Sequence, residues 1–322
     1  MSNLCFLAFS LLPISLPPPP VSLAGWGVLG QHFQGEKPSL GENAALAAST
    51  PTPEPMTPEM TPEAPLNPVF AAPTPTSGPQ LYHQRLRALQ GGELHSRLHP
   101  SSFYPAWEKV VQHPTHLQWQ NLLAEEAKAI ARGQGQNRLN IMLGDSLTLW
   151  FPTTALSRNA FWLNQGISGE NTGQILQRLG ALDETRPSTI YIMAGVNDLR
   201  QGASDQTILR HTRQILQSLK TRHPQAEIII QSILPTRLAA IPPERIERLN
   251  QAIAQIAQSE GASYLNLAPL FQDETGQLQR ELTTDGLHLS PQGYQVWKDV
   301  LTQRFRQDSE ESPEILEVMV QN

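Results

Sequence analysis

The feature that most constrains the fold is a regular alternation of short apolar runs and longer amphipathic segments between residues 139 and 305. The intervening segments carry apolar residues at helical spacing, for example Ile246, Leu249 and Ile253. Alternating strands and helices predict a parallel sheet with right-handed crossovers. The sequence therefore predicts an α/β fold, a flavodoxin-like three-layer sandwich with a five-stranded parallel sheet. The five runs are apolar at most positions, as in strands covered on both faces, and they span 139–143, 161–164, 189–194, 227–233 and 264–267.

Outside this alternating region, composition divides the 322-residue chain into further parts. Residues 31–80 are rich in proline among Thr, Glu and Ala. Such a stretch cannot bury enough apolar area to offset the entropy of ordering, so it is predicted to be a disordered linker. Residues 81–134 are predicted to be a helical extension, and residues 135–306 the α/β domain. Residues 307–322 are predicted to be a frayed acidic tail.

The amino-terminal segment, residues 1–30, is apolar. Its run at 4–12 has the length of a signal-peptide core, and the small residues at 22–24 resemble a cleavage site. No Lys or Arg precedes the run, Pro13 interrupts it, and it is shorter than the roughly 20 residues that span a bilayer. We expect export or envelope association rather than a cytoplasmic location, with a mis-assigned start as the alternative. Membrane association is expected only through residues 4–15.

Charge and cysteine content argue against several kinds of partner and of bound group. The net charge is −6 and no run of Lys or Arg occurs, which argues against nucleic acid and against an anionic membrane surface. The single cysteine, Cys5, cannot form an intramolecular disulfide. No Cys or His group has the spacing of metal ligands, so neither a metal nor another cofactor is predicted.

Polar turns follow the predicted strands at the edge where parallel sheets bind their ligands. The first strand leads into Gly144-Asp145-Ser146, and Asp285 stands three residues before His288, ahead of the last helix. A serine hydroxyl attacks an acyl group only when a base takes its proton and an acid orients that base. Taken alone, a serine after a strand, such as Ser146, is more often a helix cap, and an aspartate before a glycine, such as Asp285, is often a turn former.

Two further residues are candidates for stabilising an oxyanion. Asn197 follows the third strand, and a side-chain amide is suited to donating a hydrogen bond to developing negative charge. Gly166 follows the second strand and can offer a bare backbone N–H where a Cβ would obstruct a substrate. Both residue types are also common in plain turns. Arg200 and Arg237 follow the third and fourth strands and are interpreted as solvated loop residues.

Four blocks, at 144–146, 164–169, 195–198 and 285–288, occur in the order and at the spacing of the SGNH (GDSL) hydrolase superfamily, which this chain resembles over about residues 136–306. Within that superfamily it is similar to the compact bacterial esterases related to platelet-activating-factor acetylhydrolase. The resemblance implies hydrolysis of small-molecule, glycan or lipid esters through an acyl-enzyme, without a cofactor or metal. It also implies roles by position: Ser146 as nucleophile and first oxyanion donor, Gly166 as backbone donor, Asn197 as side-chain donor, Asp285 as acid and His288 as base.

Two alternatives to a simple esterase remain open. One keeps the chemistry and changes the substrate to envelope glycans, as a carbohydrate O-acetylesterase or acetyltransferase; the proline-rich linker and the apolar amino terminus make this reasonable. The other is a non-catalytic module that binds a ligand at the same edge of the sheet. The presence of Ser146, Asp285 and His288 together counts against the binding module.

Overall fold

The structure is a computed structural model that describes residues 72–156 and 158–310. Its centre is a five-stranded parallel sheet with the strand order β2-β1-β3-β4-β5. The predicted α/β fold with five parallel strands is therefore confirmed. The strands are β1 (Leu139–Gly144), β2 (Phe161–Gly166), β3 (Thr189–Met193), β4 (Glu227–Gln231) and β5 (Ser263–Leu265).

Helices connect the strands and extend the chain on the amino-terminal side. Several begin at a residue whose side chain accepts a hydrogen bond from the first turn, such as Thr115 before α3 and Ser204 before α7. The α-helices of the described ranges are α1 (Gly78–Gln90), α2 (Tyr104–Trp107), α3 (His116–Gly133), α4 (Ser146–Leu149), α5 (Thr172–Gln177), α6 (Val196–Arg200), α7 (Asp205–Arg222), α8 (Pro243–Ser259), α9 (Ala268–Phe271) and α10 (Pro291–Glu310).

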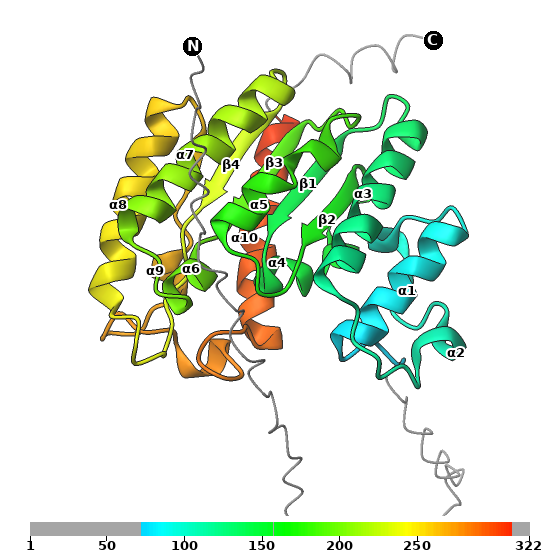
Figure 1. Cartoon of the computed structure of the whole chain (residues 1–322), viewed down its shortest axis with the longest axis horizontal. Coiled ribbons are helices and arrows are strands. Elements are labelled where there is room, and N and C mark those ends of the chain that lie inside the picture. The colour runs from blue at the N-terminus through cyan, green and yellow to red at the C-terminus, as the bar shows by residue number, and fades with distance from the viewer. Residues whose placement is uncertain (1–71, 157, 311–322) are drawn as a thin grey trace, which may run out of the picture. The chain divides into compact units, whose positions relative to one another are not determined.

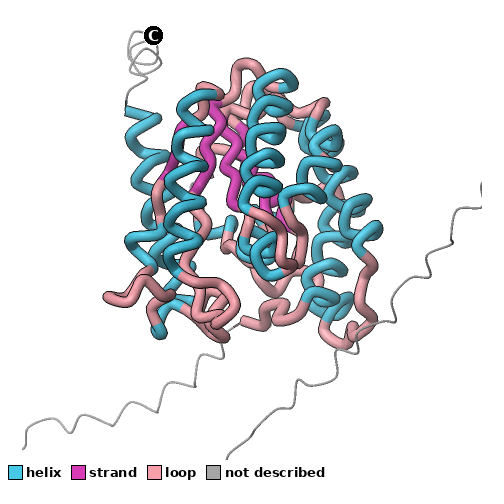
Figure 2. Tube along the Cα trace, turned by 60° about the vertical axis from the view of Figure 1, so that its left-hand side comes forward, coloured by secondary structure: helices cyan, strands magenta, loops and turns pink. Residues whose placement is uncertain are grey.

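The sheet is covered on both faces because successive side chains of a strand point to opposite sides. Ile141 and Leu143 of β1 join a core shared with α3, α5, α7 and α8. Met142, between them, joins a second core that contains Trp297 and Leu301 of α10. In Figure 1, α5 and α7 lie in front of the strands and α10 lies behind them. Figure 2, turned by 60°, shows the strands enclosed between helices.

The helical extension covers the edge of the sheet at β2. Ser96 Oγ donates to the carbonyl of Trp162 at 2.6 Å, and Arg85 Nη2 donates to the carbonyl of Asn164 at 2.7 Å. An uncovered edge strand would present unpaired backbone groups to other chains. Residues 81–134 therefore supply side chains that satisfy backbone groups of β2, and the extension packs directly on the sheet.

Two predicted boundaries are corrected by the helices. The linker predicted at 31–80 ends too late, because α1 begins at Gly78 behind the capping side chain of Ser77. The tail predicted from residue 307 begins too early, because α10 continues to Glu310. The apolar segment 1–30, most of the linker and the last residues of the tail lie outside the described residues.

The predicted strands 227–233 and 264–267 are both longer than those observed, because side chains take over the backbone hydrogen bonds where the sheet ends. The side-chain amide of Asn250 bonds both the N–H and the C=O of Ile233, each at 2.8 Å. Ser232 Oγ accepts hydrogen bonds from two backbone amides at the end of the second predicted run, each at 2.9 Å. Backbone groups bonded in this way have no need of a neighbouring strand.

No helix within residues 72–156 and 158–310 combines the length and apolarity required to cross a membrane.

Candidate active site

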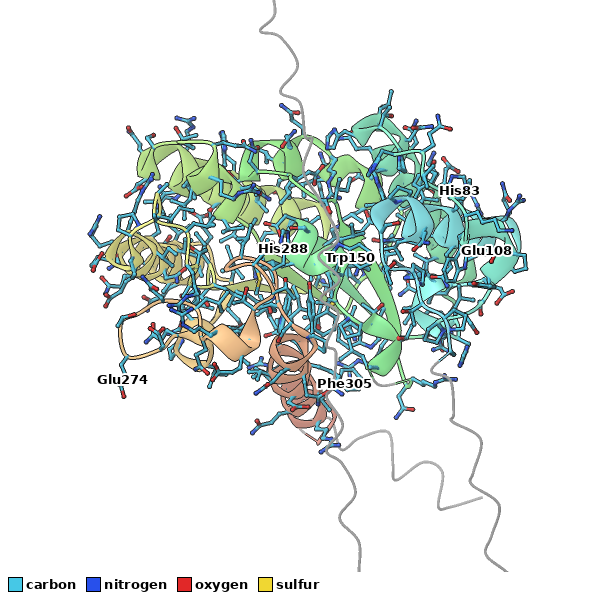
Figure 3. The ribbon with its side chains drawn as sticks, turned by 90° about the horizontal axis from the view of Figure 1, so that it is seen from below. His83, Glu108, Trp150, Glu274, His288 and Phe305 are labelled. Carbon is cyan, nitrogen blue, oxygen red and sulfur yellow. The ribbon has the colours of Figure 1, made fainter. Side chains whose placement is uncertain are left out.

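The carboxyl ends of β1, β2 and β3 lie side by side. The register pairs Gly144 with Gly166 on one side and with Met193 on the other. In Figure 1 these strands point downward, toward α4, α6 and the loop before α10. Figure 3 looks onto this end of the molecule, and His288 lies near the middle of the view. The four turns singled out in the sequence thus lie at one end of the sheet.

Three side chains from distant parts of the sequence form one hydrogen-bonded chain. Ser146 Oγ lies 3.2 Å from Nε2 of His288, and Nδ1 of the same ring lies 2.7 Å from Oδ2 of Asp285. A carboxylate only accepts hydrogen bonds, so Nδ1 carries the ring proton and Nε2 presents its lone pair to the hydroxyl. The side chain of His288 is 38% exposed, which leaves the imidazole open to a ligand from solvent. In this geometry an imidazole can deprotonate a serine.

The turn that carries Ser146 depends on the two residues before it. A Cβ at Gly144 would lie 2.4 Å from the carbonyl oxygen of Met193, so the close approach of β3 requires glycine here. Asp145 caps α4 by accepting a hydrogen bond from the amide of Leu147 at 2.9 Å. Ser146 is the first residue of this short helix, where backbone N–H groups have no helical partner.

The loop that carries His288 is fixed by its own hydrogen bonds and by the segment after β4. Thr283 Oγ1 donates to the carbonyl of His288 at 2.7 Å and accepts from the amide of Gly286 at 2.9 Å. Gly286 has a φ of 87°, and its carbonyl accepts the amide of Arg237 at 2.7 Å. Arg237 therefore supports this loop through its backbone and is more than the solvated residue that the sequence suggested.

Asp285 stays ionised because three N–H groups surround it. Burial alone would raise the pKa of Asp285, but the hydrogen bonds outweigh it and hold the pKa below its usual value. Oδ2 accepts from the His288 ring, and Oδ1 accepts from the amides of Leu287 at 3.0 Å and His288 at 2.7 Å. These three hydrogen bonds fix the orientation of the carboxylate that holds the imidazole.

Asn197 lies in α6, directly after β3, and its amide is held at both ends. Nδ2 donates to the carbonyl of Glu170 at 3.0 Å, and Oδ1 accepts from Nη1 of Arg200 at 3.0 Å. The residue is 2% exposed. Since an amide nitrogen carries two hydrogens, one N–H of Asn197 remains to donate to a ligand.

Glu170, in the turn after β2, links Asn197 to the helical extension. Its side chain is fully buried, and its carboxylate accepts from Nε of Arg178 at 2.7 Å. The other carboxylate oxygen lies 2.9 Å from Nε2 of His116, the first residue of α3. The carbonyl that receives the amide of Asn197 is therefore anchored from two sides.

The prediction for Gly166 needs correction. Its amide donates to Oδ1 of Asn164 at 2.9 Å, so this N–H is already used. A Cβ at Gly166 would lie 2.2 Å from the amide nitrogen of Leu149 and 2.8 Å from the carbonyl oxygen of Asp145. Gly166 is therefore required for the packing of α4 against β2, and its backbone does not face an open site.

Gly169, three residues further along, has the properties that were expected of Gly166. It is exposed and has a φ of 83°, and no atom lies within 4 Å of where its Cβ would be. Within residues 72–156 and 158–310 its amide has no hydrogen-bond acceptor. The sequence did not distinguish the two glycines, because both lie in the block 164–169. Only Gly169 is adjacent to Glu170, whose carbonyl accepts the hydrogen bond from Asn197.

Asp145 is buried, and one of its oxygens, Oδ2, has no hydrogen-bond partner among the described residues. Burial raises the pKa of Asp145 to about 7, although the amide of Leu147 and the nearby His288 oppose this shift. Unfolded aspartate releases its proton near pH 4, so between about pH 4 and 7 the folded chain binds more protons than the unfolded chain. The contribution of Asp145 to stability therefore falls as pH rises through this window.

Asp145→Asn should remove this pH dependence, because an amide does not ionise. Between pH 5 and pH 8 the free energy of unfolding of the variant should rise by about 1–4 kcal/mol relative to the parent. Urea unfolding at both pH values measures the difference. Asp299→Asn, an exposed aspartate on α10, is the matched control. A difference between variant and parent that stays constant with pH would show that Asp145 is already ionised in the folded state.

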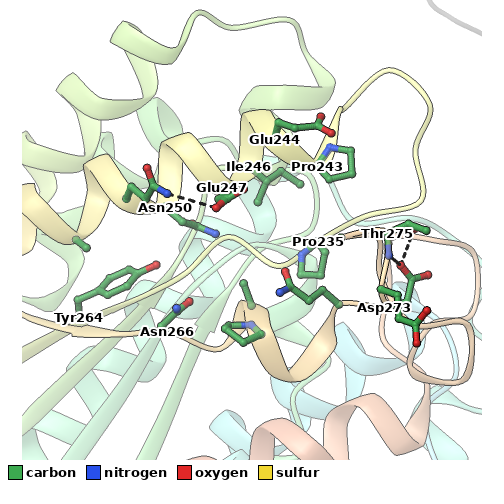
Figure 4. A pocket seen from close by; sticks show the side chains of 17 residues that line it. Pro235, Pro243, Glu244, Ile246, Glu247, Asn250, Tyr264, Asn266, Asp273 and Thr275 are labelled. Atoms are coloured by element: carbon green, nitrogen blue, oxygen red, sulfur yellow. Dashed lines mark hydrogen bonds between the residues drawn. The ribbon is translucent and has the colours of Figure 1, made fainter.

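A cavity of about 670 Å³ lies elsewhere, between α8, α9 and the loop after α9 (Figure 4). Tyr264, Asn266 and Asp273 are among its lining residues. The lining contains neither serine nor histidine, so it lacks a pair like Ser146 and His288. Within the described ranges, no group of three or more His, Cys, Asp or Glu side chains is placed to hold a metal ion.

Comparisons with known proteins place this geometry in context. The model of the GDSL-like lipase/acylhydrolase family matches residues 130–296. Platelet-activating factor acetylhydrolase IB subunit alpha1 of Pongo abelii is 30% identical over 162 residues, which are 48% of this chain and 69% of that protein. The alpha2 subunit from Homo sapiens is 28% identical over 185 residues, which are 54% of this chain and 79% of that protein.

Among solved structures, a Streptococcus pneumoniae protein provisionally described as a platelet activating factor superposes with a TM-score of 0.53. It is 27% identical in sequence, and the superposition covers 58% of this chain and 93% of that chain.

Proposed function

The chain belongs to the GDSL-like lipase/acylhydrolase family and hydrolyses esters, and from this premise we propose that Ser146, His288 and Asp285 are its catalytic residues and that short acyl esters are its substrates. The observation that carries the proposal is the hydrogen-bonded chain from the serine hydroxyl through the imidazole to the carboxylate.

The first half of the reaction forms an acyl-enzyme. Nε2 of His288 takes the proton of Ser146 as Oγ attacks the ester carbonyl. Asp285 keeps the ring in the tautomer with hydrogen on Nδ1 and stabilises the imidazolium that forms. His288 then gives its proton to the leaving alcohol. In the second half, water attacks the acyl group by the same route and releases the acid.

The tetrahedral oxyanion needs donors fixed before the reaction begins. We assign three: the amide of Ser146 at the start of α4, the free side-chain N–H of Asn197, and the amide of Gly169 in place of Gly166. The support for Gly169 is its exposed position, an amide without an acceptor among the described residues, and its neighbour Glu170, whose carbonyl accepts a hydrogen bond from Asn197.

Short acyl groups are proposed because the relatives of highest similarity reported above are named acetylhydrolases. Hydrolysis rates with p-nitrophenyl acetate, butyrate and octanoate test the acyl length. Acetylated xylan, assayed beside them, tests whether the acetyl group is carried by a glycan. A kcat/KM that rises from acetate to octanoate would contradict the short-acyl assignment.

Asn197→Ala should lower kcat on p-nitrophenyl acetate by roughly 10²–10³, because one oxyanion donor is lost. KM should change little, since the oxyanion exists only in the transition state. Asn137→Ala is the control, because this asparagine lies in the turn before β1, at the opposite end of that strand from Ser146. Unchanged kcat/KM in Asn197→Ala would remove this residue from the oxyanion hole.

A further inference from the structure

Asn197 can donate to an oxyanion only if its nitrogen, and not its oxygen, faces the substrate. The two ends of an amide have nearly the same shape, so packing alone does not choose between them. A reversed amide would turn its oxygen toward the carbonyl of Glu170 and toward the developing oxyanion, and both contacts would be repulsive. The hydrogen bonds around the amide therefore determine whether Asn197 helps or hinders the reaction.

Arg200 makes the hydrogen bond that marks the oxygen end of this amide. It lies three residues after Asn197 in α6, a spacing that brings two side chains onto one helix face. Its Nη1 donates to Oδ1 of Asn197 at 3.0 Å. A bond from a guanidinium is charge-assisted, and it draws electron density toward the oxygen, which makes the N–H of the same amide a stronger donor.

No carboxylate of the described residues forms an ion pair with Arg200. Among the ion pairs of the described residues, Arg178 binds Glu170, Arg237 binds Asp273 and none involves Arg200. The hydrogen bond to Asn197 is the side-chain interaction that the structure gives it.

We propose that Arg200 is a positioning residue, whose guanidinium holds and polarises the side-chain amide of Asn197 in the orientation that binds the oxyanion. The inference rests on the proposed function and deepens it. It gives a role to an arginine that the sequence suggested was only a solvated loop residue: Arg200 is exposed, but it ends α6 and bonds Asn197. Arg200 acts through Asn197 and does not itself contact the reacting atoms.

Arg200→Met tests the inference, because methionine fills similar space without donating a hydrogen bond. We expect kcat on p-nitrophenyl acetate to fall about tenfold with KM unchanged, the loss expected for one charge-assisted hydrogen bond. Arg200→Lys, which keeps a positive donor, should recover part of this loss. Arg210→Met, an exposed arginine of α7, is the matched control and should behave as the parent.

The decisive comparison adds Arg200→Met to Asn197→Ala. Once the amide is gone, Arg200 has nothing to position, so the double variant should be no slower than Asn197→Ala alone. Equal tenfold losses in both backgrounds, a raised KM with unchanged kcat, or parental activity of Arg200→Met would each overturn the inference. These results leave the proposed function standing as long as Ser146→Ala is inactive. An active Ser146→Ala variant would instead reject the proposed function, and the inference with it.

Discussion

Replacing Ser146 with alanine should lower kcat on p-nitrophenyl acetate by about 10⁶ while leaving the fold unchanged. Without Oγ no acyl-enzyme can form, and the oxyanion donors alone leave only a small residual rate. Ser146 is 7% exposed, and its hydroxyl bonds only the His288 ring among the described residues, so little packing is lost. Steady-state kinetics with the purified variant measure the loss, and circular dichroism with urea unfolding checks the fold.

Ser218→Ala on α7 makes the same chemical change away from the carboxyl ends of the strands. It should retain full activity, so a loss confined to Ser146→Ala cannot come from a general effect of serine removal. A Ser146→Ala variant that is folded and keeps more than about a hundredth of the parental kcat would contradict a nucleophilic role.

Asp285→Asn should lower kcat by about 10⁴, because the carboxamide no longer enforces the tautomer with hydrogen on Nδ1 of His288. In the parent, Oδ2 of Asp285 accepts that hydrogen at 2.7 Å. An amide nitrogen in the same place would instead favour a lone pair on Nδ1 and hydrogen on Nε2, which faces Ser146. The serine would then lose its base. The kcat of the variant at neutral pH measures the effect.

The backbone bonds of the loop provide a check on Asp285→Asn. Oδ1 accepts the amides of Leu287 and His288, and an asparagine oxygen can do the same, so the loop should keep its shape. Asp299→Asn on α10 serves again as the matched control. A variant within tenfold of the parent would mean that Asp285 does not orient the base.

The positions of the strands and the three hydrogen-bonded side chains could be predicted from the sequence for a physical reason. Strands buried on both faces must be apolar throughout, so their ends are visible as the first polar residues. In a parallel sheet those ends gather at one edge, which places Ser146 near Asn197 without knowledge of the side chains. Asp285 and His288 were found because both residue types stand close together just before a helix that begins with proline.

Other features depended on contacts that a sequence does not display. Gly166 is the last residue of β2 and Gly169 lies in the turn that follows, and only the packing of Leu149 and the bond to Asn164 separates their roles. Arg200 is exposed, and its contact could not be foreseen from the sequence because its partner is a neutral amide. The spacing from Asn197 to Arg200 was a signal that both share a helix face.

The sequence predicted that the extension is helical, but it did not predict that the extension packs against β2. Apolar residues at helical spacing indicated α3. The packing of the whole extension against β2, however, depends on buried polar contacts between distant residues. Arg85 pairs with Glu126 and also donates to the carbonyl of Asn164. Nothing local in the sequence around Arg85 indicates either partner.

The most direct test of the catalytic chain is covalent trapping of the intact protein with a fluorophosphonate, followed by peptide mass spectrometry. A serine reacts with this probe only when a neighbouring base activates it. We expect one phosphonyl adduct on the peptide containing Ser146, greatly slowed in His288→Ala and absent in Ser146→Ala. An adduct on another residue, or labelling of Ser146 at the parental rate in His288→Ala, would contradict the proposal that the imidazole of His288 activates the hydroxyl of Ser146.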